Sequence, residues 1–257
     1  MSMRLRLMGA CLMLSVWGAA PLHAQPAPVS IAEALQASSR SSDNVKLDAG
    51  RKPADVLNFI GLQPGMRAID MFGANRYWSE IMAPVVGQAG HVTVWQPRQF
   101  LNEARQKEFA DFAARQGNVT LLTSPFEQPL LGTEAYDALI MNLDYHDVYW
   151  QNAERKIPQM SPDAWLAQLF KAMKPGAVLG IIDHAANPGS DTREVVEKYH
   201  RIDPAVVRAD FERAGFTFEG SSDLLRNPAD DHLTNVFDPK VRGQTDRFLF
   251  KFRKPAA

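Results

Sequence analysis

The chain has 257 residues, of which 46% are hydrophobic, and its 28 basic and 29 acidic residues leave a formal charge of −1. A chain of this length can bury one sizeable core. The balanced charge does not imply the broad basic face that nucleic-acid binding requires, so no nucleic-acid partner is expected. The single cysteine, Cys11, lies near the amino terminus. Disulfides, thiol nucleophiles and cysteine–zinc sites are therefore excluded from the rest of the chain.

Residues 1–24 have the pattern of a secretory signal peptide. Arg4 and Arg6 precede an apolar stretch over residues 7–20, and the small Ala24 stands before the expected cleavage point. The apolar stretch is shorter than the run of about 20 residues that spans a membrane. We expect a periplasmic or secreted protein that keeps no membrane span once the signal is removed.

The remaining chain divides into a linker and one domain. Residues 25–52 form an amino-terminal linker that contains a short helix, because Ser30 is followed three residues later by Glu33, the spacing of a capping box. The polar residues 38–51 are predicted to be irregular. Residues 53–257 are predicted to form a single α/β domain.

Short apolar runs alternate with helix-length segments through this domain, which predicts a parallel sheet with right-handed crossovers. The chain ends differently, because its last two predicted strands enclose a long loop, an arrangement that suits an antiparallel closing strand. The expected strands are 66–71, 91–95, 119–123, 136–143, 178–183, 217–221 and 247–252. The expected helices are 53–60, 78–85, 102–116, 162–173 and 204–214.

A tight turn between strand and helix follows the first predicted strand. That strand ends near Asp70, and the small residues Gly73 and Ala74 precede the next helix. In open α/β sheets such a turn lies at the carboxyl end of a parallel strand, where nucleotide-like ligands bind. The sequence therefore predicts a cofactor pocket beside Asp70.

This region resembles the class I S-adenosylmethionine-dependent methyltransferases, in which an acidic residue and a glycine-rich loop follow the first strand. The segments 136–141, 173–179 and 214–216 also fall in the order of that family. The segments 145–147 and 183–184 and the tail 226–243 resemble, more narrowly, an exported bacterial group of predicted methyltransferases.

The resemblance implies an α/β fold, a Rossmann-like methyltransferase sandwich. Its sheet would have seven mostly parallel strands with an antiparallel last strand, and helices would cover both faces. It also implies S-adenosylmethionine as the cofactor and a small molecule as the methyl acceptor.

The same resemblance assigns the cofactor-binding residues. Asp70 takes the acidic position, the glycine-rich loop corresponds to the residues from Phe72 onward, Gln96 takes the place of the acid that holds the ribose, and Phe126 is placed to flank adenine. The loop residues are Phe72, Gly73, Ala74 and Asn75.

This sequence departs from the family pattern at two of these places. The loop keeps one glycine and contains the bulky Arg76, and Gln96 lacks the charge of a carboxylate. The alternatives are that Asp70 caps its loop, that Gln96 is an ordinary polar residue at a strand end, and that Phe126 is an apolar anchor.

Histidines follow two neighbouring strands of the predicted sheet. His146 comes after the fourth strand and His184 after the fifth, so both belong at the carboxyl rim. Asp147 stands beside His146, and His232 lies in a late loop that can reach the same rim. These four residues are the candidate catalytic group, for proton transfer or substrate binding. Structural roles are the alternative.

A metal role for the histidines has less support, because no helical pair of histidines strengthens it, and no metal ligands are assigned. His91 and His200 are assigned structural or solvent-exposed roles. The long segment 144–161 contains three aromatic residues and is interpreted as a substrate lid.

Three functions remain open at this stage. The first is methyl transfer from S-adenosylmethionine. The second is a binding protein that uses the same scaffold without catalysis, because both cofactor motifs are altered. The third, metal-assisted hydrolysis, depends only on the histidines.

Overall fold

The computed structural model describes residues 27–256. The predicted signal peptide lies outside the described residues. Within the described part, no helix is both long enough and apolar enough to cross a membrane.

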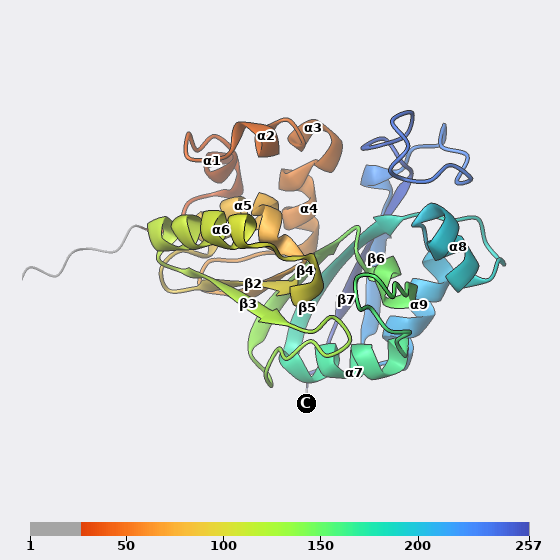
Figure 1. Ribbon diagram of the computed structural model, residues 1–257. Helices are drawn as coiled ribbons and strands as arrows, with labels where there is room; N and C mark the ends of the chain where they lie inside the picture. Colours follow the sequence, from red (N-terminus) through yellow and green to blue (C-terminus); the bar gives the residue numbers. More distant parts are fainter. Residues whose placement is uncertain (1–26, 257) are drawn as a thin grey trace, which may run out of the picture.

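A seven-stranded sheet forms the centre of the molecule (Figure 1). Its strand order is β3-β2-β1-β4-β5-β7-β6, and only β7 runs against its neighbours. The predicted sheet, with parallel strands and an antiparallel last strand, is thereby confirmed. The strands are β1 (Arg67–Met71), β2 (His91–Pro97), β3 (Val119–Ser124), β4 (Tyr136–Asn142), β5 (Met173–His184), β6 (Thr217–Ser222) and β7 (Arg247–Arg253).

Helices connect the strands, and most begin at a residue that satisfies free backbone N–H groups. Ser30 and Glu33 form the predicted capping box, and the side chains of Asn102, Ser161 and Asp191 cap later helices. The helices are α1 (Ile31–Leu35), α2 (Ser42–Val45), α3 (Asp48–Arg51), α4 (Pro53–Ile60), α5 (Tyr77–Val86), α6 (Glu103–Gln116), α7 (Pro162–Ala172), α8 (Thr192–Tyr199) and α9 (Pro204–Arg213). Short 3₁₀ turns are η1 (Gly73–Asn75), η2 (Arg98–Phe100), η3 (Tyr145–Tyr149) and η4 (Asp223–Leu225).

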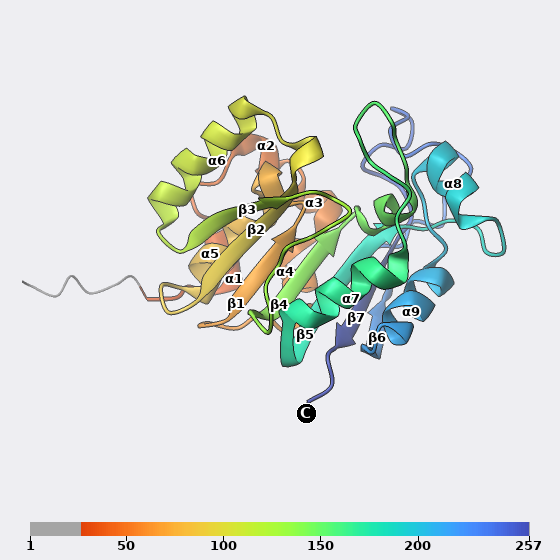
Figure 2. The same ribbon diagram turned by 60° about the horizontal axis from the view of Figure 1, so that its bottom comes forward.

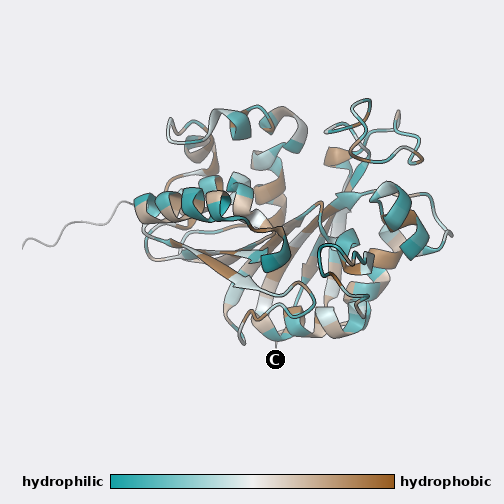
Figure 3. Ribbon diagram, viewed as in Figure 1, coloured by the Kyte–Doolittle hydropathy of each residue, from teal (hydrophilic) through white to brown (hydrophobic). Residues whose placement is uncertain are grey.

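The sheet is covered on both faces, as Figure 2 shows from below. Helices α1, α4, α5 and α6 contribute to one hydrophobic cluster, and α7 and α9 contribute to the other. In Figure 3, the ribbon of α6 is coloured largely as hydrophilic. At Gly180 in β5, a Cβ atom would lie 2.2 Å from Cδ1 of Ile60, so glycine lets α4 pack directly onto the sheet.

The segment 38–51 is more ordered than the sequence predicts. It contains α2 and α3, which are held by the Arg40–Asp48 ion pair at 2.7 Å. Asp48 also accepts a hydrogen bond from the Tyr77 hydroxyl of α5. Such contacts depend on a partner far along the chain, which a local pattern does not reveal. In Figure 1, α3 and the loop between β6 and β7 both lie above the sheet.

Candidate functional site

Asp70 ends the buried strand β1 and is itself buried, with neither carboxylate oxygen in a hydrogen bond. Burial raises the pKa of the Asp70 carboxyl group to about 7. The positive charge of Arg51 and the backbone N–H of Ser79 both act to lower this pKa. The Ser79 N–H faces the carboxyl group but does not form a hydrogen bond of normal geometry. A Cβ atom at Gly73 would lie 2.3 Å from the Asp70 carboxyl carbon. The one glycine of the loop therefore lets the backbone close over this carboxyl group.

Gln96 and Asn75 have partners within the protein. Gln96 is buried at the end of β2, and its Oε1 accepts a hydrogen bond from the backbone N–H of Ala74 at 3.1 Å. The Asn75 side chain accepts from the backbone N–H of Tyr77 at 3.0 Å, at the start of α5. Both side chains thus hold the loop in this conformation.

Aromatic side chains fill the space between the ends of β1, β2 and β3. Phe126 is fully buried, and the Phe72 ring packs against it at 5.2 Å and against Trp95 at 5.1 Å, in both cases edge to face. Phe72 has a positive φ of 57°, an uncommon conformation for a bulky residue. Phe126 therefore lies in the core here, as an apolar anchor.

Arg76 lies outside this cluster. Its φ is 67°, and its guanidinium extends toward Glu108 of α6, with 4.0 Å between the nearest charged atoms. The side chain therefore does not enter the space beside Asp70.

A cavity of about 630 Å³ opens over the other half of the rim, above β4 and β5. Two arginines line it: Arg51 at the end of α3 and Arg247 at the start of β7. Each has a buried nitrogen without a hydrogen-bond partner, Nη1 in Arg51 and Nε in Arg247. Its other lining residues include Leu143, Asp144, His146, Asp147, His184 and Phe237.

His146 is held by a carboxylate of the neighbouring strand. Asp183 of β5 accepts hydrogen bonds from the backbone N–H and from Nδ1 of His146, both at 2.8 Å. Burial lowers the pKa of His146, but the carboxylates of Asp183, Asp147 and Asp144 outweigh it and raise the value to about 9. In the absence of another cation, His146 therefore carries a proton at neutral pH.

His184 lies in the same cavity, with its ring centroid 6.0 Å from that of His146. Its Nδ1 shares a hydrogen bond of 2.6 Å with the Thr245 hydroxyl. Burial and the charge of His146 lower the pKa of His184 well below its ordinary value. The structure thus brings the two predicted histidines together at one rim. Their surroundings raise the pKa of His146 and lower that of His184.

His232 occupies a different place. Its Nε2 lies 3.0 Å from Asp246, and its Nδ1 lies 3.0 Å from Asn187. Asp246 also pairs with Arg226 at 2.8 Å. These contacts hold His232 within the late loop, and it is not among the residues that line the 630 Å³ cavity.

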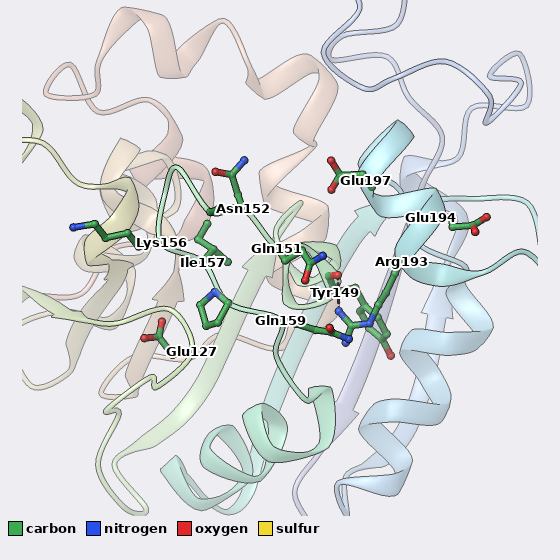
Figure 4. Close-up of a pocket in the computed structure, with 12 residues that line it drawn as sticks. Glu127, Tyr149, Gln151, Asn152, Lys156, Ile157, Gln159, Arg193, Glu194 and Glu197 are labelled. Carbon is green, nitrogen blue, oxygen red and sulfur yellow. Dashed lines mark hydrogen bonds between the residues drawn. The ribbon is translucent and has the colours of Figure 1, made fainter.

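The segment 144–161 is anchored at both ends. Arg193 of α8 donates hydrogen bonds to the carbonyl oxygens of Tyr149 at 2.8 Å and Met160 at 2.7 Å. Figure 4 shows the exposed middle of the segment, where Gln151, Asn152 and Lys156 border a second, open cavity of about 1080 Å³. A rearrangement of this segment that keeps both anchors is therefore confined to its middle part.

Three contributors to the rim are not indicated by the sequence pattern: His200, Arg51 and Arg247. His200 Nδ1 lies 3.6 Å from Asp147, although the two residues are distant in sequence. Arg51 belongs to the polar segment 38–51, where no sequence pattern distinguishes it. The available indication for His200 was its position just after a polar helix that follows β5.

No protein-family model and no curated protein matches this chain. Solved structures share its architecture. An S-adenosylmethionine-dependent methyltransferase from Aquifex aeolicus has 19% identity and a TM-score of 0.55, over 83% of this chain and 97% of that one. One from Mesorhizobium loti has 15% identity and a TM-score of 0.53, over 80% and 99%. The [4+2]-cyclase SpnF has 17% identity and a TM-score of 0.57, over 81% and 82%.

At these identities the likeness establishes the fold. The chain has the Rossmann-like methyltransferase architecture, with the strand order and the single antiparallel strand described above. The neighbours include a protein named as a cyclase, so this fold does not by itself determine the reaction.

Proposed function

We propose that the protein is an S-adenosylmethionine-dependent methyltransferase that acts on a small polar acceptor. The observation that carries this proposal is the state of Asp70, whose two buried oxygens make no hydrogen bond of normal geometry near the end of β1. An unsatisfied buried acceptor costs about 1–3 kcal/mol, so a ligand that brings a donor or a positive charge stabilises it. S-adenosylmethionine carries both an ammonium and a sulfonium group.

The residues fit this cofactor at one end and require movement at the other. Asp70 would hold its positively charged end, whereas Phe72 and Phe126 fill the space that the resemblance gives to adenine. Phe72 has a positive φ, so its backbone is strained. A rearrangement of Phe72 would relieve this strain and would open the space for adenine at the least cost. When bound, the cofactor supplies an electrophilic methyl group.

The 630 Å³ cavity is the acceptor site in this proposal. Arg51 and Arg247 line this cavity, and their positive charges favour an oxygen-rich or anionic acceptor. The protein contributes mainly by positioning the acceptor, because holding two reactants together removes much of the entropic part of the barrier.

A second candidate is a binding protein that keeps the scaffold and the acceptor cavity without methyl transfer. The observation that favours it is the closed aromatic contact of Phe72, Trp95 and Phe126, together with the use of Gln96 to hold the loop.

Calorimetric titration of the purified protein with S-adenosylmethionine and with S-adenosylhomocysteine tests the first candidate. We expect binding with one site per chain, weakened by Asp70→Asn, while Asp111→Asn on the exposed face of α6 leaves it unchanged. Absence of heat and of any thermal shift with both compounds, in folded wild-type protein, would favour the second candidate.

We also propose that the protein is exported, on the basis of the pattern in residues 1–24. Mass spectrometry of protein from its native host should find an amino terminus near Gln25. Recovery of cytoplasmic protein with Met1 intact would contradict export.

A further inference from the structure

Three side chains at the cavity rim face one another without forming hydrogen bonds. Asp147 Oδ1 lies 3.4 Å from Nε2 of His146 and 3.6 Å from Nδ1 of His200. Each of the three residues has one potential ligand atom within 4.8 Å of such an atom in the other two. Both distances exceed those of N–H···O hydrogen bonds. Asp147 Oδ1 is buried and has no hydrogen-bond partner.

The two distances from Asp147 Oδ1 are close to those between neighbouring ligand atoms around one metal ion. With bonds of about 2.0–2.1 Å, neighbouring ligand atoms of a tetrahedral ion are separated by about 3.3–3.4 Å. A hydrogen-bonded cluster would have shorter contacts. A bound cation would also satisfy the orphaned oxygen of Asp147, which otherwise costs about 1–3 kcal/mol.

Asp183 gives His146 the orientation of a metal ligand. Its carboxylate binds Nδ1 of His146 at 2.8 Å, which leaves Nε2 directed toward Asp147. In metal sites a carboxylate commonly fixes the second nitrogen of a ligating histidine in this way. Asp183 is fully buried, so this orientation is rigid.

His200 has a strained backbone conformation, and aromatic side chains pack against its ring. It ends α8 with a positive φ of 52°, which is unusual for a residue other than glycine. The rings of Phe237 and Trp150 pack against its imidazole at 4.9 and 5.5 Å. Strained conformations that the surroundings enforce are concentrated at functional sites.

We propose that His146, Asp147 and His200 bind a divalent transition-metal ion, with one coordination position open toward the cavity. Two imidazoles and one carboxylate select zinc, iron(II) or manganese over magnesium and calcium, which prefer oxygen ligands. The 630 Å³ cavity, lined by His146 and Asp147, provides the route of entry. An oxygen of the acceptor could occupy the open position and be polarised there.

This proposal is independent of cofactor binding, because none of the three ligands contacts the Asp70 loop in the hydrogen bonds or ion pairs of the described residues. Its failure would leave the methyltransferase proposal standing, and the reverse also holds.

Metal binding to protein prepared without a histidine tag tests it. After treatment with a chelator, the protein is titrated with Zn²⁺, Mn²⁺ or Mg²⁺ alone, and bound metal is counted by elemental analysis. We expect one Zn²⁺ per chain and no stoichiometric Mg²⁺. His200→Ala and Asp147→Asn should each weaken Zn²⁺ binding more than about 100-fold. Loss of a residue that only hydrogen-bonds a metal ligand typically weakens binding by about 10–100-fold, so a larger effect indicates direct coordination.

His91→Ala is the matched control, because His91 lies on β2, where its Nε2 contacts Thr120. It should bind Zn²⁺ as the wild type does. Wild-type protein that binds no stoichiometric metal, or a His200→Ala variant that binds it normally, would overturn the proposal.

A spectroscopic measurement on the wild-type protein keeps the test decisive even where a variant fails to fold. Co²⁺ in place of Zn²⁺ should give the intense visible absorption of a site with four ligands. The weak spectrum of hydrated Co²⁺ would count against the site.

Discussion

Asp183 binds His146 twice: one carboxylate oxygen accepts the backbone N–H and the other contacts Nδ1 of the imidazole, each at 2.8 Å. The two residues belong to neighbouring segments of the rim, η3 after β4 and the end of β5. One buried carboxylate therefore fixes both the backbone turn and the ring at the centre of the cavity.

Asp183→Asn should lower the pKa of His146 and destabilise the fold by about 1–3 kcal/mol, since an amide cannot accept both bonds with the strength of a carboxylate. The wild-type value of about 9 is raised mainly by this carboxylate, after burial has lowered it. NMR titration of the imidazole in chelator-treated protein measures the change. An unchanged His146 titration would show that Asp183 does not control its charge.

Stability should depend on pH through Asp70. Its pKa of about 7 in the folded protein lies above the ordinary value of 3.8, so between these values the folded state binds more protons than the unfolded state. Stability from this group is therefore greatest below about pH 4 and falls as pH rises through 7. Urea unfolding of Asp70→Asn should show a smaller decline over this window.

The exposed Asp111, which pairs with Lys107 on α6, provides the control for this measurement. Asp111→Asn should keep the wild-type decline, because exposed pairs contribute at most about 1 kcal/mol. A decline that Asp70→Asn leaves unaltered would assign the pH dependence to other groups.

Phe72→Gly should strengthen binding of S-adenosylmethionine. It removes the ring that packs against Phe126 and places glycine where φ is 57°, a conformation glycine adopts readily. Calorimetry should find at least several-fold tighter binding than in the wild type.

Arg76→Gly is matched to this change, because Arg76 also has a positive φ but its side chain extends toward α6. It relieves backbone strain without opening the aromatic cluster, so it should leave affinity nearly unchanged. Equal gains in both variants would attribute the effect to strain alone.

Asp230→Ala should destabilise the protein by about 3–5 kcal/mol, because it leaves the fully buried Arg201 unpaired. Arg201 also donates hydrogen bonds to the carbonyl oxygens of Thr234 and Ala185, so the late loop should lose protection from hydrogen exchange. Chemical unfolding measures the first effect, and exchange with mass spectrometry measures the second.

The exposed pair of Arg208 and Glu212 is the comparison. Glu212→Ala should cost less than about 0.5 kcal/mol, as pairs at this helical spacing do. A similar loss in both variants would argue against a special role for the buried pair.

The sequence alone determined the alternation of strands and helices, and with it the carboxyl rim. Hydrophobic periodicity is local, so it located β1, β4 and β5 and placed Asp70, His146 and His184 at strand ends. The parallel order of β4 and β5 then brought the two histidines together.

Only the tertiary structure decided the partners of these groups. It placed His200 beside Asp147, bound Gln96 to Ala74 and buried Phe126 in the core. These contacts join segments that are far apart in sequence, and their formation depends on how α8, the Asp70 loop and the aromatic rings pack together. A repeating local pattern specifies which face of an element is buried, but the distance between two side chains on different elements is set by the packing of all the residues between them.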